Sequence, residues 1–582
     1  MSIFILHRNQ SLDAASKTVA NSLIANGFKK AKAINNQEYS LIFLQKLIYA
    51  DRPEHPLADP FLQIDKDNFI GYSGSFFFDG LIGTEALKAC FTAFNPKNSD
   101  PLDWQRTNGQ FTLIVQKGSG LFIAADNLGA CKIYHNNERT IFSNSFQVLV
   151  DLIPHGDIDI QGCYEYAWNG NTFGEITFIN QIRSTPFDHT VLVKKNCTFV
   201  KRDNLVKWRA APPKISFEET AELQIAKLRR LFTIYKNCFG NRINTALSGG
   251  YDSRLILALF LDAGITPSLF VYGPNGDPDV ETAKSIAAGE GLALDVIDKS
   301  QLVDMDPERF PEHIEKNWAI FDGWKLAGLF DSGIDTSDRI NRSHSHLVVN
   351  GGVGEIYRNF FYLPDRPITI KELIWAFFSR DDPRTCSEVF SSKHYRENLE
   401  DSLIQALGDG ADWNERGRTE MAYPLFRGRY WTARDAALNT RIGWAAFPFL
   451  EPSVNLDTWH IPLKYKEYGH LEARMIQILN PKLASYKSVY GYNFASTPGL
   501  GYRLSNWSSS NRPIWLRGYL YRAKNNRRKP LPFFLQDNYL ERVIDTSFPR
   551  MKQFFNMKRI NDPEVYNRIA TMEYALTRRG WA

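Results

Sequence analysis

The fold is decided by residues 241–264, which read NRINTALSGGYDSRLILALFLDAG. The apolar run Ile243–Leu247 predicts a buried strand, and the apolar spacing over Leu255–Leu261 predicts a helix that ends at Gly264. Between them, small residues allow a tight turn, so that loop N–H groups and the helix N-terminus can face a bound anion. This stretch therefore predicts an anion-binding loop in an α/β domain.

The side chains of this loop suit a nucleotide better than a bare phosphate. Ser248 and Ser253 add hydroxyl donors, and Asp252 adds a carboxylate that can hold the magnesium ion of a nucleotide. No lysine follows the glycines, so the loop is not of the GxxxxGK[ST] type. Residues 248–253 (SGGYDS) instead resemble the SGGxDS pyrophosphate loop of the ATP pyrophosphatases, in particular of the asparagine synthetase superfamily. Enzymes with that loop cleave ATP between the α- and β-phosphates, so the resemblance implies ATP and Mg²⁺ as cofactors.

After the loop the chain alternates between predicted strands and helices. Pro267–Gly273 and Leu292–Ile297 have the composition of buried strands, and Val280–Gly291 between them has that of a helix. Such alternation predicts a doubly wound parallel sheet that binds ligands at the carboxyl ends of its strands. The resemblance implies the adenine nucleotide α-hydrolase-like form of this fold, and helices are expected to dominate from Thr369 on.

Tyr272-Gly273 resembles the superfamily's second segment, in which a strand end meets the adenine. An acidic turn with Asp277 and Asp279 follows, as in the superfamily. For these two carboxylates a helix-capping role and a ligand role both stay open.

The strand predicted at His346–Asn350 ends in residues 351–355, GGVGE, which resemble the superfamily's GEGSDE segment. By position, Glu355 is then the acidic residue that joins Asp252 on the magnesium ion. The resemblance implies the following nucleotide-binding residues: Leu247, Ser248, Gly249, Gly250, Asp252, Ser253, Tyr272, Gly273 and Gly351.

The resemblance gives Lys487 a catalytic role together with Asp252. Ala445–Glu451 resembles the superfamily's EARVPFLD turn, although Ala446 stands where the superfamily has arginine. A helix is expected from Lys464 to Arg474, and a turn and Lys487 follow, in the order in which the superfamily places a lysine facing the ATP phosphates and the acyl-adenylate. A fixed cation there can stabilise both reaction oxyanions. A free surface lysine is the alternative.

Residues 1–205 are expected to be mostly β. Short apolar runs separated by Gly and Asn turns predict an antiparallel sandwich, with strands at Ser2–Leu6, Phe69–Ser73, Gln110–Gln116, Leu121–Ala125, Lys132–His135, Thr140–Ser143, Thr190–Lys194 and Thr198–Arg202.

The stretch from Asn108 to Tyr134 resembles the amino-terminal glutaminase domain of asparagine synthetases, which has an Ntn-hydrolase-type sandwich. The nucleophile of that domain is a cysteine at position 2, where this chain has Ser2. We therefore expect a degenerate glutaminase-like domain kept for structure or substrate docking. The pattern breaks around Lys207–Pro213, which predicts domains at 1–210 and 211–582, and a long amphipathic helix is expected over Phe217–Phe239.

The totals exclude several classes of protein. With 582 residues the chain is long enough for two to four domains, and its net charge of +5 is too weak to indicate a nucleic-acid partner. The six cysteines show no CxxC spacing, so neither a zinc site nor a disulfide framework is predicted. No signal-peptide pattern and no run of about 18 apolar residues occurs. We expect a cytoplasmic protein without a nucleic-acid or membrane partner.

Three further groups of residues leave alternatives open. His344 and His346 fit packing or surface roles better than metal ligation, because no third ligand is apparent. Near the C-terminus a basic cluster fits a solvated helix face, with a docking site for an acidic or peptide substrate as the alternative; it comprises Arg517, Arg522, Lys524, Arg527, Arg528 and Lys529. Unranked candidates for substrate contacts are Trp324, Lys325, Tyr357 and Arg358.

The resemblance extends to members with a non-functional glutaminase domain, such as lasso-peptide cyclases and β-lactam synthetases. It implies an AMP-forming ligase that adenylates a small-molecule or peptide carboxylate, releases pyrophosphate and transfers the acyl group to an amine. A partner protein, either a peptidase or a glutaminase, is an open alternative. So are an asparagine synthetase that uses ammonia or a partner glutaminase, and a non-catalytic nucleotide-binding protein.

Overall fold

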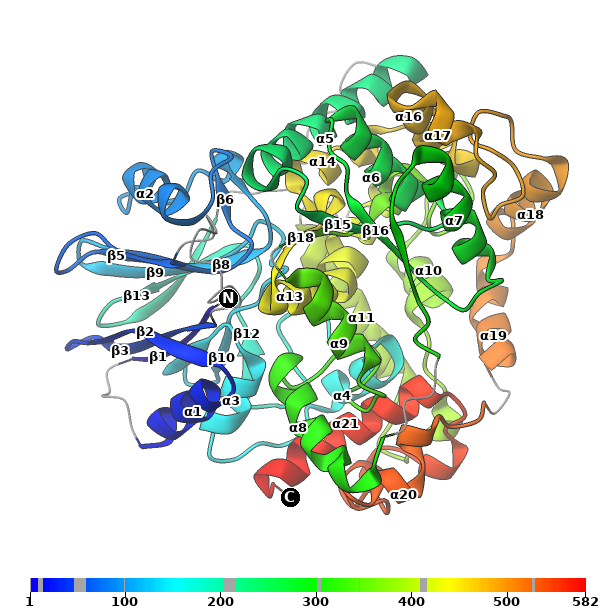
Figure 1. The fold of residues 1–582 in the computed structure, drawn as a ribbon. Coiled ribbons are helices and arrows are strands. Elements are labelled where there is room, and N and C mark those ends of the chain that lie inside the picture. Colours follow the sequence, from blue (N-terminus) through cyan, green and yellow to red (C-terminus); the bar gives the residue numbers. More distant parts are fainter. Residues whose placement is uncertain are drawn as a thin grey trace.

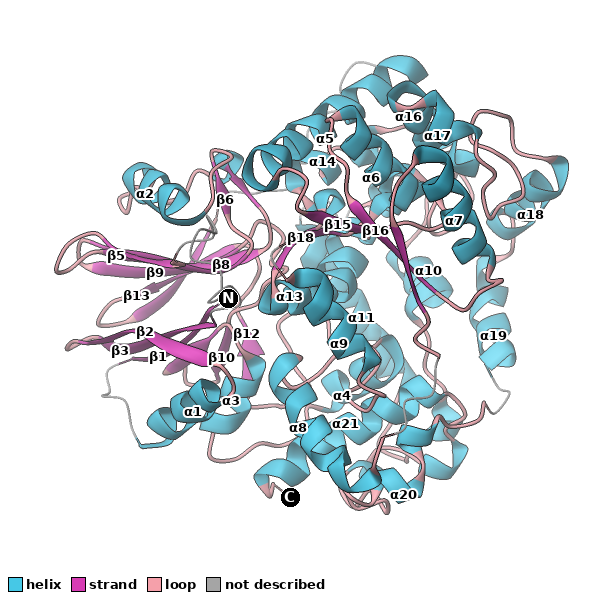
Figure 2. Cartoon of the chain, viewed as in Figure 1, coloured by secondary structure: helices cyan, strands magenta, loops and turns pink. Residues whose placement is uncertain are grey.

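The computed structural model describes residues 2–8, 14–46, 59–98, 100–202, 215–300, 305–344, 346–408, 416–525 and 529–581. Two antiparallel sheets formed by the first 202 residues lie beside a larger part that is built on a parallel sheet and many helices (Figure 1, Figure 2). The mixed architecture expected from the sequence is confirmed at this level. The domain boundary predicted around 207–213 lies outside the described residues.

The amino-terminal part is a sandwich of two six-stranded antiparallel sheets. Its strand orders are β12-β10-β11-β1-β3-β2 and β14-β13-β9-β8-β5-β4. The strands are β1 (Ser2–Arg8), β2 (Phe28–Asn35), β3 (Tyr39–Lys46), β4 (Phe61–Gln63), β5 (Phe69–Gly74), β8 (Phe111–Lys117), β9 (Gly120–Ala125), β10 (Tyr134–Asn136), β11 (Ile141–Ser143), β12 (Ile182–Ser184), β13 (His189–Val193) and β14 (Cys197–Lys201). A separate small pair joins β6 (Phe77–Phe78) to β7 (Thr107–Asn108).

Both faces of the first sheet are buried, which explains its nearly continuous apolar strands. Along β1, Phe4 and Leu6 belong to the core between the sheets, whereas Ile3 and Ile5 belong to the core under the helices. The outer faces are covered by α1 (Ala14–Ala25), α2 (Gly83–Ala93) and α3 (Phe146–Leu152) (Figure 1). The three predicted hairpins are confirmed, because β8 pairs with β9, β10 with β11, and β13 with β14.

The parallel sheet has the order β17-β16-β15-β18-β19, so the chain reverses its direction of travel across the sheet between β15 and β18. Its strands are β15 (Ile243–Ala246), β16 (Ser268–Tyr272), β17 (Leu294–Ile297), β18 (Leu347–Val349) and β19 (Trp444–Ala446). One face carries α5 (Phe217–Phe239), α6 (Tyr251–Asp262) and α7 (Pro278–Glu290), and the other carries α9 (Ile334–Ser343) and α13 (Ala433–Ile442) (Figure 1). In such sheets, ligands bind where the strand order reverses.

The predicted elements of this part are largely confirmed, with two differences. Helix α5 has the predicted bounds, and Ser216 and Glu219 form a capping box at its start. Helix α6 begins at Tyr251 rather than Leu255, because Gly250 is its N-cap and the polar residues form its first turn. The segment 444–446, expected to belong to a turn, is the edge strand β19.

The remaining chain is mainly helical, as expected. Its helices are α4 (Ile160–Asn169), α8 (Phe310–Ile320), α10 (Ile370–Leu373), α11 (Ser392–Leu407), α12 (Arg416–Glu420), α14 (Pro452–Asn455), α15 (Leu463–Lys466), α16 (His470–Leu479), α17 (Pro481–Ser485), α18 (Leu500–Ser510), α19 (Ile514–Asn525), α20 (Asp537–Leu540), α21 (Pro563–Arg579) and the π-helices η4 (Ile374–Phe378) and η7 (Tyr423–Thr432). The helix expected over Lys464–Arg474 is broken, because Tyr468 has a positive φ of 54°. No described helix has the length and apolar composition to cross a bilayer.

Candidate active site

The loop between β15 and α6 is held in a fixed turn by its own serines. The Ser248 N–H donates to the Ser253 hydroxyl at 3.0 Å, and the two hydroxyl oxygens lie 2.9 Å apart. The Gly250 N–H donates to the Ser248 hydroxyl at 3.3 Å. Residues Ser248–Ser253 therefore form a local hydrogen-bonded unit at the N-terminus of α6, where the helix dipole favours negative charge.

A carboxylate from α7 binds this loop. The Gly249 N–H donates to Asp279 Oδ1 at 2.8 Å, whereas Asp277 is the N-cap of α7 and accepts from the Asp279 N–H. Of the two roles left open for these residues, Asp277 therefore has the capping role, and Asp279 contacts the loop. The contact shows that an oxyanion fits at the Gly249 N–H.

Asp252 and Glu355 come together around one guanidinium group. Arg358 donates to Asp252 Oδ2 at 2.6 Å and lies 3.7 Å from Glu355 Oε1. Its Nε lies 3.2 Å from a carboxylate oxygen of Glu472, whose side chain is fully buried. Glu355 also accepts from the Tyr423 hydroxyl at 2.5 Å. The two expected metal ligands thus share a cation supplied by the chain, and Glu472 is a third carboxylate that the sequence did not reveal.

This cluster perturbs the charge state of its members. Burial raises the pKa of Asp252 to about 6 although Arg358 opposes the rise. Burial and the Asp252 carboxylate raise the pKa of Glu472 well above its usual value, although Arg358 opposes the rise. Burial alone would lower the pKa of the Arg358 guanidinium, but the three carboxylates around it raise it. Arg358 therefore stays charged.

The loop after β18 is shaped to meet Asp252. A Cβ at Gly354 would overlap Asp252 Oδ1, and one at Gly351 would touch the Asp252 backbone at 3.4 Å. Val353 between them has a φ of 74°, which is rare for a β-branched residue and is typical of strained functional loops. Asp252 Oδ1 is buried and has no hydrogen-bond partner among the described residues. The small residues of this segment therefore serve close approach to the first loop.

Lys487 lies on a segment that crosses the first loop. The Val489 N–H donates to the Gly249 carbonyl at 3.3 Å, and a Cβ at Gly249 would overlap the Val489 side chain. The Lys487 side chain is exposed, and its ammonium pairs with no residue in the described part of the chain. The structure thus brings the Lys487 backbone to the loop and leaves its ammonium free in solvent.

Arg254, which the sequence analysis passed over, fixes this segment. It is fully buried, and its guanidinium donates to the carbonyls of Tyr486 at 2.9 Å and Lys487 at 3.1 Å. Tyr251 is also fully buried, stacks on Phe494 with a centroid distance of 4.1 Å and donates to the Tyr468 carbonyl. An arginine inside an otherwise apolar helix was the only signal in the sequence that could have identified the first of these anchors.

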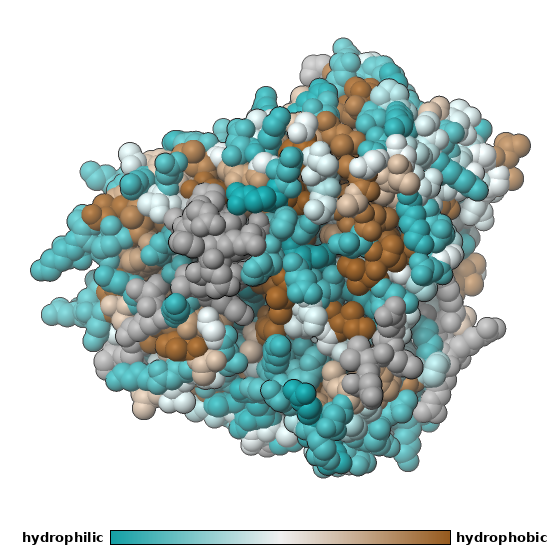
Figure 3. Space-filling model, viewed as in Figure 1, coloured by the Kyte–Doolittle hydropathy of each residue, from teal (hydrophilic) through white to brown (hydrophobic). Residues whose placement is uncertain are grey.

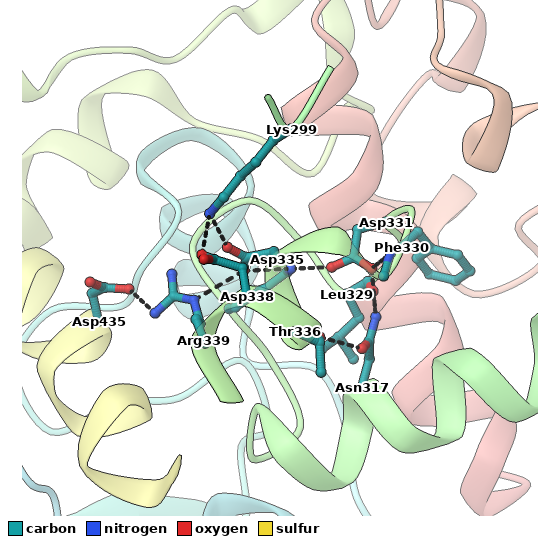
Figure 4. Close-up of polar contacts among 12 residues, drawn as sticks. Lys299, Asn317, Leu329, Phe330, Asp331, Asp335, Thr336, Asp338, Arg339 and Asp435 are labelled. Atoms are coloured by element: carbon teal, nitrogen blue, oxygen red, sulfur yellow. Dashed lines mark hydrogen bonds and ion pairs between the residues drawn. The ribbon is translucent and has the colours of Figure 1, made fainter. Parts of the chain in front are cut away.

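Tyr272 is engaged in an ionic network next to the strand end. Its hydroxyl donates to Asp338 at 2.8 Å, and Lys299 lies over its ring at 3.8 Å. Figure 4 shows Lys299 reaching to Asp335 and Asp338 of α9, and Arg339 bridging Asp335 to Asp435. The Tyr272 side chain is therefore engaged in this network. The backbone of Tyr272-Gly273 is left at the strand end to contact the nucleotide expected from the sequence.

The four unranked candidates for substrate contacts have different places in the structure. Lys325 belongs to the same network, because it pairs with Asp331 and lies 3.4 Å from Asp335. Trp324 and Tyr357 are buried core residues. Of the four unranked candidates for substrate contacts, Arg358 alone joins the two loops.

His344 and His346, and the basic cluster near the C-terminus, are engaged in separate contacts. His346 Nδ1 bonds to the His344 carbonyl at 2.7 Å, which is a local contact, and Ser345 between them lies outside the described residues. Within the described ranges no group of three or more His, Cys, Asp or Glu residues is arranged to hold a metal ion. In the basic cluster, Arg517 donates to the carbonyls of Phe361, Tyr362 and Ser509. Arg522 lies 3.8 Å from Asp381 and Lys529 lies 3.3 Å from Asp562; the side chain of Lys524, and Arg527 and Arg528, fall outside the described residues.

The amino-terminal sandwich docks onto the parallel sheet through two of the quoted motifs. Glu451 accepts from the Gly109 N–H at 2.9 Å, from Gln110 Nε2 at 3.0 Å and from Asn108 Nδ2 at 3.2 Å. Burial raises the pKa of Glu451 to about 7. Ser2 is buried, and its hydroxyl has no hydrogen-bond partner among the described residues, so no described group is placed to act as a base on it.

Comparisons with known proteins add little to this geometry. No family model matches the chain, and none of the curated proteins matches it. Solved structures that match include one described as the allosteric regulatory enzyme of purine biosynthesis and the glutamine phosphoribosylpyrophosphate amidotransferase from B. subtilis complexed with ADP and GMP. Both are 8% identical in sequence; the alignments cover 51% of this chain and 80% and 65% of those chains, with TM-scores of 0.25 and 0.22. Similarity at this level supports no argument about fold or function.

Proposed function

We propose that this protein is an ATP-dependent, AMP-forming ligase that joins a carboxylate to an amine. The observation that carries the proposal is the meeting of two small-residue loops at the point where the strand order reverses. Asp252 and Glu355 lie near one guanidinium group, that of Arg358, and the hydrogen-bonded loop Ser248–Ser253 contains Asp252. In a parallel sheet this is where a nucleotide binds.

The residues at this point fit a nucleotide-bound magnesium ion. Asp252 has a buried oxygen without a hydrogen-bond partner among the described residues, and the lack of a side chain at Gly354 lets this oxygen lie against the second loop. Mg²⁺ in nucleotide sites takes one or two carboxylates together with phosphate oxygens. The ion would neutralise the phosphate charge. Asp252 and Glu355 would hold it, and Arg358, released from the pair, would then be a cation for the phosphates.

The remaining residues of the site orient the reactants. In the proposed reaction a substrate carboxylate attacks the α-phosphorus of ATP, pyrophosphate leaves, and an amine then displaces AMP from the acyl-adenylate. The loop N–H groups and Ser248 and Ser253 would bind the pyrophosphate, and Lys487 would stabilise the developing oxyanions. Alignment of the reactants accounts for much of the rate enhancement in such a site.

The amino-terminal sandwich, which we propose is an Ntn-hydrolase-type domain without glutaminase activity, would not supply ammonia. Ser2 replaces the expected cysteine, and its hydroxyl contacts no described base. The amine would therefore be a substrate in its own right or come from a partner protein. A cyclase that uses the amine of the same molecule remains within the proposal.

The proposal is tested by pyrophosphate release from ATP and Mg²⁺ in the presence of pooled carboxylates and amines. We expect release that depends on one pool and falls at least ~100-fold in Asp252→Asn and in Lys487→Ala. Asp262→Asn, at the far end of α6, is the matched control and should retain activity. ATP binding without release in any pool would favour the nucleotide-binding protein, and no ATP binding would contradict the proposal.

A further inference from the structure

A long segment next to the candidate site carries no negative charge. Residues 473–536 contain no Asp or Glu and 11 Lys or Arg residues, whereas the whole chain has a net charge of only +5. The segment includes α18 and α19 as well as Lys487. The rest of the chain has a net charge of −6, so the excess of basic residues is confined to this segment. Arg474, Lys482, Arg522 and Lys529 lie close to acidic residues of other segments, whereas Arg503 and Arg512 are exposed on or next to α18.

Helix α18 exposes the apolar face that a surface helix normally buries. Leu500, Leu504 and Trp507 follow one another at helical spacing, and they are 75%, 65% and 60% exposed. No residue of α18 is buried. In Figure 3, apolar side chains project at the edge of the molecule where Figure 1 places α18. Arg503 is exposed beside Leu504.

Helix α19 continues this surface on a firm base. Trp515 and Tyr519, one turn apart, are 64% and 56% exposed. The helix is anchored to η4 beside these residues, because the Trp375 indole donates to the Trp515 carbonyl at 2.9 Å, and the Trp375 ring fills the space beside Gly518 and packs against the Tyr519 ring with a centroid distance of 5.5 Å. The exposed aromatic residues are therefore presented by an anchored helix and not by a loose tail.

We propose that the α18–α19 surface, defined by Leu500, Arg503, Leu504, Trp507, Arg512, Trp515 and Tyr519, binds an anionic lipid bilayer at its interface. Leucine and aromatic side chains next to cations are the composition of helices that lie in the interfacial plane. Trp and Tyr prefer the headgroup level, and basic residues near the surface are attracted to anionic lipids. The expectation of no membrane partner rested on the lack of a spanning segment, which interfacial binding does not need.

Other occupants fit this surface less well. A second copy of the chain in a two-fold contact would bring the surface that carries Arg503 and Arg512 against itself, so like charges would repel. A groove that holds a peptide has walls that partly shield its lining side chains from solvent. The side chains of the α18–α19 surface instead project into solvent. An anionic bilayer complements the charge and accommodates projecting apolar side chains.

The surface adjoins the candidate active site. Tyr502 of α18 packs against Tyr490 and Tyr492 with centroid distances of 5.5 and 5.3 Å, and Arg358 donates to the Tyr490 hydroxyl at 3.4 Å. Membrane binding does not depend on the proposed ligase activity, and either proposal can fail alone. If both hold, the enzyme acts beside a membrane surface.

Co-sedimentation of the full chain with lipid vesicles tests the proposal. We expect binding to vesicles of mixed phosphatidylcholine and phosphatidylglycerol, little binding to phosphatidylcholine alone, and weaker binding at high salt. Two double variants should each lower the affinity for anionic vesicles at least ~10-fold. One is Leu504→Ser with Trp507→Ser, and the other is Arg503→Glu with Arg512→Glu. Leu223→Ser, which removes a 45% exposed leucine of α5, is the matched control and should bind like the wild type.

Several outcomes would overturn the proposal. The proposal is wrong if the protein does not bind anionic vesicles, or if both double variants bind them as tightly as the wild type does. If the wild type is a dimer and the double variant Leu504→Ser with Trp507→Ser is not, the surface binds a second copy of the chain. If the protein binds polyglutamate as tightly as it binds vesicles, and Leu504→Ser with Trp507→Ser does not weaken that binding, the surface binds an acidic protein. Because all the substituted side chains are exposed, unchanged thermal melting is expected and serves as the folding control.

Discussion

At the scale of single residues, Arg358 is the side chain that organises the candidate site. It lies between Asp252, Glu355 and Glu472, and the last of these is fully buried. A buried carboxylate that loses its partner costs far more than an exposed one, because no water replaces the lost charge. The stability of this region therefore depends on Arg358 before any ligand arrives.

We expect Arg358→Gln to lower the free energy of unfolding by about 3–5 kcal/mol, the usual cost of removing one partner of a buried ion pair. Urea denaturation followed by circular dichroism measures the loss. Arg358→Lys keeps the charge and should lose less, and adding Glu472→Gln to Arg358→Gln should recover part of the stability. A loss below about 1 kcal/mol in Arg358→Gln would show that the cluster is solvated and not buried.

At the scale of elements, the ionic network around α9 joins that helix to its neighbours. Asp335 lies close to Lys299, Lys325 and Arg339. Burial alone would raise the pKa of the Asp335 carboxyl, but these three cations lower it below its usual 3.8. The network balances its charges internally, which is why we assign it to structure and not to ligand binding.

The sign of the pH effect follows from this lowered pKa. A carboxyl group with a lower pKa in the folded state stabilises the fold above its unfolded-state pKa and loses that contribution as the pH falls below about 4. We expect wild type to exceed Asp335→Asn in unfolding free energy by ~3 kcal/mol at pH 7, and the difference to shrink below about pH 4. Urea denaturation over a pH series measures it. The control Asp295→Asn, an exposed residue of β17, should match wild type throughout; a difference that does not depend on pH would contradict the assignment.

At the scale of the whole molecule, Glu451 joins the two parts of the chain. It accepts three hydrogen bonds from Asn108, Gly109 and Gln110 of the sandwich, and it lies five residues after the end of β19, the edge strand of the parallel sheet. The sandwich is thus packed on the strand that precedes Glu451. This contact gives the sandwich a structural role in the molecule.

We expect Glu451→Ala to lower stability by at least ~2 kcal/mol, because it leaves buried donors without an acceptor. Calorimetry should then resolve two transitions where the wild type has one. Because the pKa of Glu451 is raised from its usual 4.5 to about 7, this carboxyl contributes less stability as the pH rises between those values. Glu451→Gln should remove that pH dependence. A single unchanged transition in Glu451→Ala would show that Glu451 does not couple the two parts.

The sequence by itself determined the local elements. The hairpins of the sandwich, the bounds of α5 and the strand–loop–helix at 243–262 follow from apolar periodicity, turn residues and caps, which act over a few neighbouring positions. The same local signals identified both small-residue loops and Asp252, whereas Glu355 was singled out by the resemblance of residues 351–355 to a family segment. The edge strand β19 was missed because three residues inside an apolar run carry no periodicity of their own.

Only the tertiary structure decided which side chains meet. Arg358 and Asp252 are 106 residues apart, and Glu451 and Gly109 are 342 residues apart, so no spacing in the sequence could pair them. Tertiary packing also buried Glu472 and Arg254, committed Tyr272 to the α9 network and left the apolar face of α18 exposed. Local sequence sets the conformation of each element, but burial and electrostatic pairing depend on all the elements that pack together, and these come from the whole chain.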